Sequence, residues 1–419
     1  MFFIYSIVYA AVIVILFVPQ YLARPKELRR KWLKEKLGYF PKTDSSLWIH
    51  AVSVGEVGAS VPLLKKLREE YPDFQIIFST VTDTGQEVAS AKVPCGTSVV
   101  YLPFDIGFVL RRCLRRVNPK IFITIETELW PNMFRIFGDR GVPVLILNGR
   151  ISEKSSKGYE KISFFMKKVL DNVKIFGMQS QTDADRVIRI GADPQKVMIL
   201  GNFKFDGDIP GGVPSWALAI KGPVIVAGST HSGEEEIVIE AYRENLERFP
   251  GLKLLLAPRH PARFREVADL LRTKGIPFVK RSELCARPDE VKEKTEQGTF
   301  NRHVILLDSV GELPSVYGIA DIAIVGKSFM GHGGQNPLEP AFWGKPILCG
   351  PHMENFPFIR EFYREGAAFE VEPSRLAKKI REILVSPEKA EFAGKKGKEL
   401  YQRNSGAVQR AMEIVKEFV

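Results

Sequence analysis

Cysteine and histidine are both scarce in this sequence. The chain of 419 residues has only four cysteines and six histidines, and no CxxC pair is present. The cysteines are Cys95, Cys113, Cys285 and Cys349. Disulfide-stapled domains and zinc fingers need clustered cysteines, so both are excluded and a reducing compartment is predicted. The histidines lack metal-ligand spacing, and we therefore predict no metal site and no cofactor.

Fingerprints of common nucleotide-binding loops are also missing. The first strand-to-helix turn has no GxGxxG, which argues against a nicotinamide or flavin dinucleotide. Gly326-Lys327-Ser328 resembles the end of a P-loop, but Asp321 stands where the upstream glycine is needed. The net charge of +11 comes without a zinc finger, an RNA-binding signature or an aromatic-basic stripe, so no nucleic-acid partner is predicted.

Charge is absent from Met1 to Leu22, a run close to the roughly 20 apolar residues that span a bilayer core. Basic residues follow it: Arg24, Lys26, Arg29, Arg30, Lys31, Lys34 and Lys36. A cleaved signal peptide would carry its charge before the run. We predict a single membrane anchor beside an anionic membrane surface, with the rest of the chain cytoplasmic and able to fold without it. Spanning is favoured, and the alternative is a buried helix or an amphipathic helix lying in the membrane interface.

The remaining sequence alternates short β-branched runs with amphipathic stretches, which indicates parallel sheets covered by helices. The predicted strands are 47–52, 75–80, 98–102, 121–125, 142–148, 173–179, 223–228, 252–257, 276–279, 303–307, 322–325 and 346–348. Their two series predict an α/β protein with two doubly wound, Rossmann-like domains facing a cleft.

Composition shifts set the predicted boundaries, and a stretch rich in glycine and proline separates the two series. The segments are an anchor (1–23), a basic juxtamembrane segment (24–46), a first domain (47–206), a linker (207–222) and a second domain with a C-terminal helix (223–419).

Ligands of parallel sheets bind beyond the carboxyl ends of the strands, and acidic residues stand there in the first domain. Glu56 follows Ser53 and Gly55 at the start of a helix, where it is either a general base or an acid favoured by the helix dipole. Glu126 and Glu128 follow another strand. A buried carboxylate at a strand tip is costly without a partner or a role, which favours function for Glu126.

In the second domain the strand ends indicate a phosphate-bearing ligand. Ser229, Thr230 and His231 precede a helix, and Arg259 with His260 ends the next strand, where a guanidinium suits phosphate. Ordinary turns with a helix cap are the alternative for either motif alone.

A glycine-rich segment before a later helix also suits a phosphate or a sugar. It contains Gly333, Gly334, Asn336 and Glu339, and the Glu339 carboxylate could accept hydrogen bonds from ribose hydroxyls.

Together these motifs resemble, in order, those of the 3-deoxy-D-manno-octulosonic acid (Kdo) transferases. The matching segments are His50–Gly58, Tyr101–Asp105, Glu126–Asn132, Asn148–Glu153, Gly201–Asp206, Ser229–Glu234, Pro258–Pro261 and Gly333–Pro340. One departure is Gln335, where the family usually carries histidine. Glutamine keeps hydrogen bonding but cannot titrate, so a proton-transfer role there is in doubt.

The resemblance implies a GT-B fold and inverting transfer of Kdo from CMP-Kdo to the lipid A precursor (lipid IVA), at the cytoplasmic face of the bacterial inner membrane and without a metal. It implies catalytic roles for Glu56 and Glu126. The implied donor-binding residues are Asn202, Lys204, Ser229, Thr230, His231, Arg259, His260, Gly333, Gly334, Asn336 and Glu339. The implied acceptor-binding residues are Ser53, Gly55, Glu128 and Arg150.

Two other classes of function stay open at this stage. Another GT-B enzyme acting on a sugar nucleotide, a glycosyltransferase or an epimerase, would share the fold, although an epimerase needs no membrane anchor. A non-catalytic scaffold that binds lipid A would not need acids at two strand tips.

Overall fold

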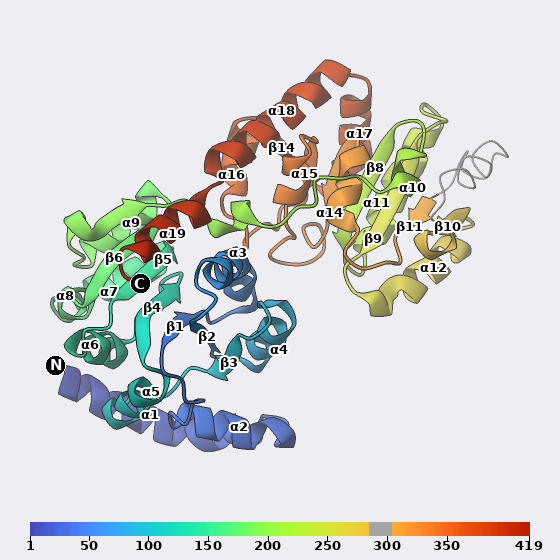
Figure 1. Ribbon diagram of the computed structural model, residues 1–419. Coiled ribbons are helices and arrows are strands. Elements are labelled where there is room, and N and C mark those ends of the chain that lie inside the picture. Colours follow the sequence, from blue (N-terminus) through green and yellow to red (C-terminus); the bar gives the residue numbers. More distant parts are fainter. Residues whose placement is uncertain (285–303) are drawn as a thin grey trace. The chain divides into compact units, whose positions relative to one another are not determined.

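The computed structural model describes residues 1–284 and 304–419, so Cys285 and the first residue of the predicted strand 303–307 lie outside the described residues. The chain forms two compact units (Figure 1). Unit 1 comprises Met1–Gly207 and Asn404–Val419, and unit 2 comprises Asp208–Arg403.

Unit 1 is built on a seven-stranded parallel sheet in the order β3-β2-β1-β4-β5-β6-β7. The strands are β1 (Ser46–His50), β2 (Gln75–Thr80), β3 (Ser98–Tyr101), β4 (Pro119–Ile125), β5 (Val144–Gly149), β6 (Val173–Met178) and β7 (Val197–Ile199). The central strands are buried along nearly their whole length, as both faces of a parallel sheet must be.

Helices cover this sheet on both faces, and each face has its own apolar core. They are α1 (Phe2–Leu22), α2 (Lys26–Lys36), α3 (Val54–Glu70), α4 (Asp83–Lys92), α5 (Gly107–Val117), α6 (Pro131–Asp139), α7 (Glu153–Glu160), α8 (Ser163–Leu170), α9 (Gln181–Arg189) and α19 (Ala407–Lys416), with short 3-10 turns η1 (Pro194–Lys196) and η2 (Phe203–Asp206).

Unit 2 repeats the plan with a parallel sheet in the order β10-β11-β9-β8-β12-β13-β14. Its strands are β8 (Val224–Thr230), β9 (Lys253–Pro258), β10 (Phe278–Lys280), β11 (Val304–Leu306), β12 (Ile322–Val325), β13 (Ile347–Cys349) and β14 (Ala368–Glu370). Its helices are α10 (Ser215–Leu218), α11 (Glu234–Leu246), α12 (Phe264–Thr273), α14 (Leu313–Val316), α15 (Leu338–Phe342), α16 (Ile359–Arg364), α17 (Leu376–Leu384) and α18 (Pro387–Asn404), with 3-10 turns η3 (Pro261–Arg263), η4 (Arg281–Glu283), η5 (Tyr317–Ile319) and η6 (Pro373–Arg375).

These two sheets confirm the predicted fold class, an α/β protein with two doubly wound domains. The sequence analysis missed β7 and β14, the last strand of each sheet. Each is three residues long and pairs on one side, so neither leaves a long apolar run in the sequence.

The C-terminal helix corrects the predicted boundary of the second domain, because residues 404–419 belong to unit 1. Ala407, Val408 and Ala411 of α19 lie in the same core cluster as Leu63 of α3. The Asp206 carboxylate accepts a hydrogen bond from the Val408 amide at 2.7 Å. A carboxylate at a helix N-terminus is favourable, and nothing local in the sequence reveals this pairing.

The apolar N-terminal helix α1 is long enough to cross a membrane, yet it packs along unit 1 (Figure 1). At its start Phe2 meets Phe165 of α8, with ring centroids 5.4 Å apart. Near its end Phe17 meets Trp32 of α2 at 5.9 Å. The helix therefore contacts unit 1 near both of its ends. The prediction that the rest of the chain folds without it stays a prediction.

Candidate functional site

The loop between β1 and α3 positions Glu56. Ser53 is the N-cap of α3, and its hydroxyl donates to Glu56 Oε1 at 2.8 Å. The Val52 amide donates to Glu56 Oε2 at 2.7 Å. The buried Glu56 carboxylate is therefore fixed at the start of α3, which agrees with an acid favoured by the helix dipole. Both of its oxygens still have lone pairs for a further partner, so a role as general base stays open.

The loop between β4 and α6 carries Glu126 in a strained conformation. Its φ of +60° lies in the left-handed region, which costs a residue other than glycine about 1–2 kcal/mol. Burial and then the negative charge of Glu56 raise the pKa of its carboxyl, while Arg150 and Lys204 oppose this shift. Strain of this kind persists where the surrounding structure enforces it, commonly at functional sites.

Glu56, Glu126 and Glu128 line one pocket of about 180 Å³ in unit 1, together with Arg150. Burial, followed by the charges of Glu56 and Glu126, raises the pKa of Glu128 to about 7. Three carboxylates in so small a space disfavour full ionisation, so this pocket can both hold and release a proton near neutral pH.

Two loops of this pocket are tied together at Thr127 and Arg150. The Thr127 hydroxyl donates to the Arg150 carbonyl at 2.7 Å, and the Arg150 amide donates to the Thr127 hydroxyl at 3.0 Å. The sequence analysis missed four polar residues of the lining: Thr127, Ser152, Ser155 and Tyr159. Ser152, the N-cap of α7, could have been found from its position after a strand.

Asn202 and Lys204 were predicted to bind the donor, and both lie in unit 1. The Asn202 carboxamide donates to Gln179 Oε1 at 3.0 Å and accepts from the Lys204 amide at 3.0 Å. The Lys204 ammonium acts electrostatically on Glu126 and Glu56, and burial lowers its pKa. Lys204 thus supplies positive charge to the carboxylate pocket.

In unit 2 the ends of β8 and β9 bring together His231, His260 and Arg259. The two imidazole rings lie 5.5 Å apart, and burial lowers the pKa of His231. The Arg259 side chain is exposed, and no ion pair is described for it. Ser229, with φ of +58°, precedes Thr230, whose buried hydroxyl donates to Glu235 at 2.8 Å. The Thr230 hydroxyl therefore donates to a buried carboxylate of unit 2 rather than to a ligand.

A buried carboxylate that the sequence analysis overlooked organises the neighbouring loop. Glu234 accepts hydrogen bonds from the amides of His231, Lys327, Ser328 and Phe329 at 2.6–2.9 Å. Lys327 and Ser328, which resemble the end of a P-loop in the sequence, therefore donate their backbone amides to the Glu234 carboxylate.

The glycine-rich segment is explained largely by packing. Gly333 and Gly334 have φ of +103° and +66°, and a Cβ there would lie 2.2 Å from Asn355 Nδ2 and 2.3 Å from Met353 Sδ, so the local fold favours glycine at both positions. Asn336 accepts from the Leu338 amide at 3.1 Å and donates to Glu339 at 3.3 Å. This pair fixes the start of α15.

Comparison with known proteins adds independent information. Residues 31–207 match the family model of 3-deoxy-D-manno-octulosonic-acid transferase (kdotransferase), and residues 286–400 match that of glycosyl transferases group 1. The 3-deoxy-D-manno-octulosonic acid transferase of Haemophilus influenzae is 36% identical, over 93% of this chain and 92% of its own. That of Bordetella pertussis is 30% identical, over 89% and 87%.

Solved structures of similar fold include the complex of Staphylococcus aureus MnaA with UDP, with a TM-score of 0.54 and 12% identity over 89% of this chain and 96% of its own. The UDP-GlcNAc 2-epimerase from Neisseria meningitidis bound to UDP-GlcNAc has a TM-score of 0.53 and 12% identity, over 89% and 100%. At such identities the likeness concerns the fold alone.

Proposed function

The chain belongs to the 3-deoxy-D-manno-octulosonic acid transferase family and is a glycosyltransferase, and from this premise we propose that it moves Kdo from CMP-Kdo to the lipid A precursor lipid IVA with inversion. The observation that carries the proposal is the unit 1 pocket, where Glu56, Glu126 and Glu128 meet Arg150.

In the proposed reaction, an acceptor hydroxyl attacks the anomeric carbon of Kdo. The new C–O bond forms as the bond from that carbon to the CMP phosphate oxygen breaks, and the bonding electrons leave with CMP. Glu56 takes the hydroxyl proton as general base. Its two hydrogen bonds, from Ser53 and Val52, fix the carboxylate, which lowers the reorganisation that proton transfer requires.

Open space beside Glu56 supports this role. A Cβ on Gly55 would meet only Ser53 Oγ, at 3.8 Å, and one on Gly58 would meet nothing within 4 Å. Glycine in a helix is about 1 kcal/mol less favourable than alanine. No described protein atom requires glycine at either position, so we assign these two to close approach of the substrate, with Ser53 and Gly55 on the acceptor side.

Two basic residues stand beside the three carboxylates: Arg150 lines the pocket, and Lys204 acts electrostatically on Glu126 and Glu56. We propose that Arg150 and Lys204 bind anionic groups of the substrates, while Glu126 and Glu128 accept hydrogen bonds from sugar hydroxyls. Since the pKa of Glu128 is raised to about 7, it is partly protonated at neutral pH and repels those anionic groups less.

For the donor, we propose that Arg259, His231, His260 and Ser229 of unit 2 bind the CMP portion. The exposed guanidinium suits the single phosphate of the leaving group, and the two imidazoles add donors beside it. Asn336 and Glu339 are proposed to contact the nucleoside. Gly333, Gly334 and Thr230 are proposed to shape the donor-binding loops rather than to contact the donor, because each of them makes close contacts within unit 2.

We further propose that α1 attaches the protein to the cytoplasmic face of the inner membrane by lying in the interface. Tyr9, Ile13, Phe17 and Tyr21 pack onto unit 1, whereas other aliphatic residues of α1 face outward. The outward residues include Ile4, Ile7, Val8, Val14, Ile15 and Val18. Because one side of α1 packs onto unit 1 while its other side is exposed and apolar, we propose the interfacial alternative rather than a span.

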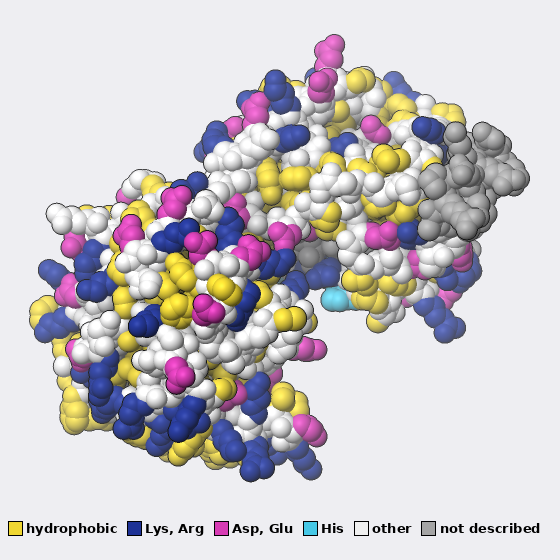
Figure 2. All heavy atoms as spheres, viewed as in Figure 1, with side chains coloured by type: hydrophobic (Ala, Val, Ile, Leu, Met, Phe, Trp, Pro, Cys, Tyr) yellow, Lys and Arg dark blue, Asp and Glu magenta, His cyan; other side chains and the backbone are white. Residues whose placement is uncertain are grey.

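Basic side chains support the same attachment. Figure 2 shows Lys and Arg side chains beside hydrophobic ones at the edge of unit 1 that carries α1 and α2. Each basic residue near an anionic surface adds about 1 kcal/mol of attraction.

The decisive experiment incubates the purified full chain with CMP-Kdo and lipid IVA in detergent and analyses the lipid by mass spectrometry. We expect a mass increase of one or more Kdo units together with released CMP. Release of CMP without a lipid product would support a sugar-nucleotide hydrolase or epimerase instead. Binding of the lipid without CMP release would support the scaffold alternative.

A further inference from the structure

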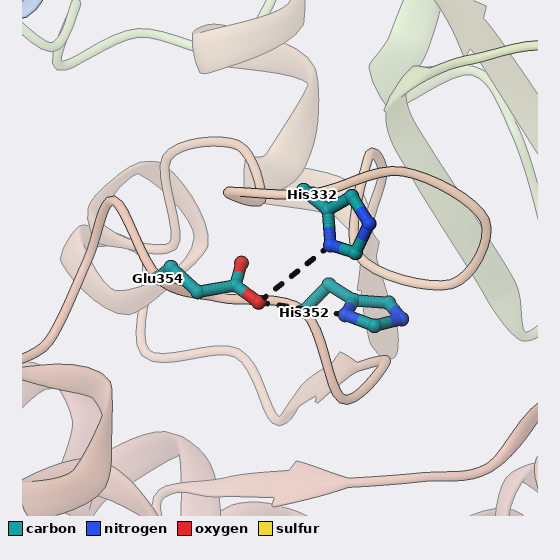
Figure 3. Close-up of side chains that lie close together, drawn as sticks. All are labelled: His332, His352 and Glu354. Carbon is teal, nitrogen blue, oxygen red and sulfur yellow. Dashed lines mark hydrogen bonds and ion pairs between the residues drawn. The ribbon is translucent and has the colours of Figure 1, made fainter.

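Two histidines and a glutamate converge at the carboxyl ends of the neighbouring strands β12 and β13 (Figure 3). His332 lies in the loop after β12, and His352 and Glu354 lie in the loop after β13. His352 Nδ1 is 3.4 Å and His332 Nδ1 is 3.9 Å from Glu354 Oε1. One ligand atom from each residue lies within 4.8 Å of the other two.

This set has the chemistry of a zinc site with an open position. Zn²⁺ binds imidazole nitrogen and carboxylate oxygen at about 2.0–2.2 Å in tetrahedral geometry, which places neighbouring ligand atoms about 3.3–3.6 Å apart. The two separations to Glu354 Oε1, 3.4 and 3.9 Å, are close to this range. Among residues 1–284 and 304–419, this is the group of three such side chains that meets the distance condition.

We propose that His332, His352 and Glu354 bind a divalent transition-metal ion, Zn²⁺ foremost, with water in the fourth position. Two imidazoles and one carboxylate are a ligand set that such ions favour over Mg²⁺ or Ca²⁺, which prefer oxygen ligands. None of the three proposed ligands is among the residues assigned to transfer, although Gly333, which shapes a donor loop, donates to Glu354. The test of the proposal does not depend on catalysis.

Hydrogen bonds already orient the carboxylate ligand. Glu354 Oε2 accepts from the Gly333 amide at 2.6 Å, which leaves Oε1 directed at both imidazoles. The Asn355 amide also donates to the Gly333 carbonyl at 3.1 Å. Outer hydrogen bonds of this kind raise metal affinity by fixing the ligands.

A bound ion would link the loop after β12 to the loop after β13. His332 is 85% exposed at its side chain and therefore loses conformational freedom on binding. The ion would stabilise the folded state by mass action.

The test uses the full chain without a polyhistidine tag, in detergent and in excess over a chromophoric zinc chelator of known affinity. We expect one tight equivalent of Zn²⁺ and an upward shift of the melting temperature on adding the metal. His332→Gln and Glu354→Gln should each weaken the affinity at least about tenfold, since loss of an outer partner alone weakens metal binding 10–100-fold.

Controls separate this site from other zinc ligands. Cys95→Ser removes an exposed thiol, and Met330→Gln changes an exposed neighbour of His332 that is no ligand. Both should keep the tight equivalent. The His332 and Glu354 variants must melt like the parent in EDTA, which excludes misfolding. Absence of a tight equivalent, or its survival in His332→Gln with loss in His260→Gln, would overturn the proposal.

Discussion

The Tyr5 hydroxyl of α1 donates a hydrogen bond of 2.8 Å to Oδ2 of Asp105, a buried residue in the loop between β3 and α5. The same carboxylate accepts from the amides of Asn132 and Met133 at 3.0 and 2.7 Å. The Asp105 amide in turn donates to the Tyr9 hydroxyl at 3.2 Å. Helix α1 is therefore tied by hydrogen bonds to the interior of unit 1.

Removing the Tyr5 hydroxyl tests this anchoring. Tyr5→Phe keeps the ring but leaves a buried carboxylate oxygen without one donor, which typically costs about 1–3 kcal/mol. We expect a lower urea midpoint in detergent with an unchanged m-value. Tyr21→Phe is the matched control on the same helix, because its ring stacks on Phe17 and no hydrogen bond is described for its hydroxyl. Equal losses in the two variants would contradict the anchoring role.

Asp105 should make the stability depend on pH. Burial raises the pKa of its carboxyl from 3.8 to about 6. Because the folded state binds this proton more tightly, its contribution is fully present below pH 4 and is lost as the pH rises through 6. A shift of roughly two units corresponds to about 3 kcal/mol.

Asp105→Asn removes this titration, so the difference in unfolding free energy between parent and variant should change between pH 4 and 6. Urea unfolding at several pH values measures it. A difference that stays constant across this range would show that Asp105 keeps an ordinary pKa.

Glu56→Gln tests the proposed general base. Glutamine retains the size and an acceptor oxygen for the cap, but it cannot take the proton, and loss of such a base reduces turnover about 10²–10⁴-fold. CMP affinity and the melting temperature should persist. The comparison is Ser53→Ala, which removes the N-cap at a cost of about 1 kcal/mol. If Glu56→Gln melts early as Ser53→Ala does and keeps its turnover per folded molecule, Glu56 is only a helix cap, and Glu126 becomes the candidate base.

Arg259→Ala tests the donor assignment in unit 2. A hydrogen bond to a charged group contributes about 1.5–3 kcal/mol, so CMP affinity measured by calorimetry should fall roughly 10–150-fold. Arg265→Ala removes another exposed arginine, from α12 of the same unit, and should leave CMP affinity unchanged. Equal affinities for the parent and Arg259→Ala would remove this residue from the site.

Much of the fold and part of the site were predictable because their signals are local. Twelve predicted strands lie within three residues of β1–β6 and β8–β13 at each end, apart from the first residue of the predicted strand 303–307. Strand ends in parallel sheets gather on one edge, so Glu56, Glu126, Glu128 and Arg150 could be expected near one another, and they line one pocket.

Other features arise only when distant segments meet. The sequence alone determined the apolar character of α1, but contacts with Asp105 and Trp32 decided how the helix lies. It showed that the last segment is helical, but packing on α3 and the Asp206 carboxylate decided which unit that helix joins.

The same division applies to the chemistry of the side chains. The strain at Glu126, the raised pKa of Glu128 and the meeting of His332 with Glu354 depend on loops that are adjacent in space. The alternation of strand and helix segments and the residues at helix starts depend on neighbours in the sequence, so the sequence alone predicts them. Burial, electrostatic coupling and ligand convergence are sums over contacts between segments far apart in the chain, so only the tertiary structure decides them.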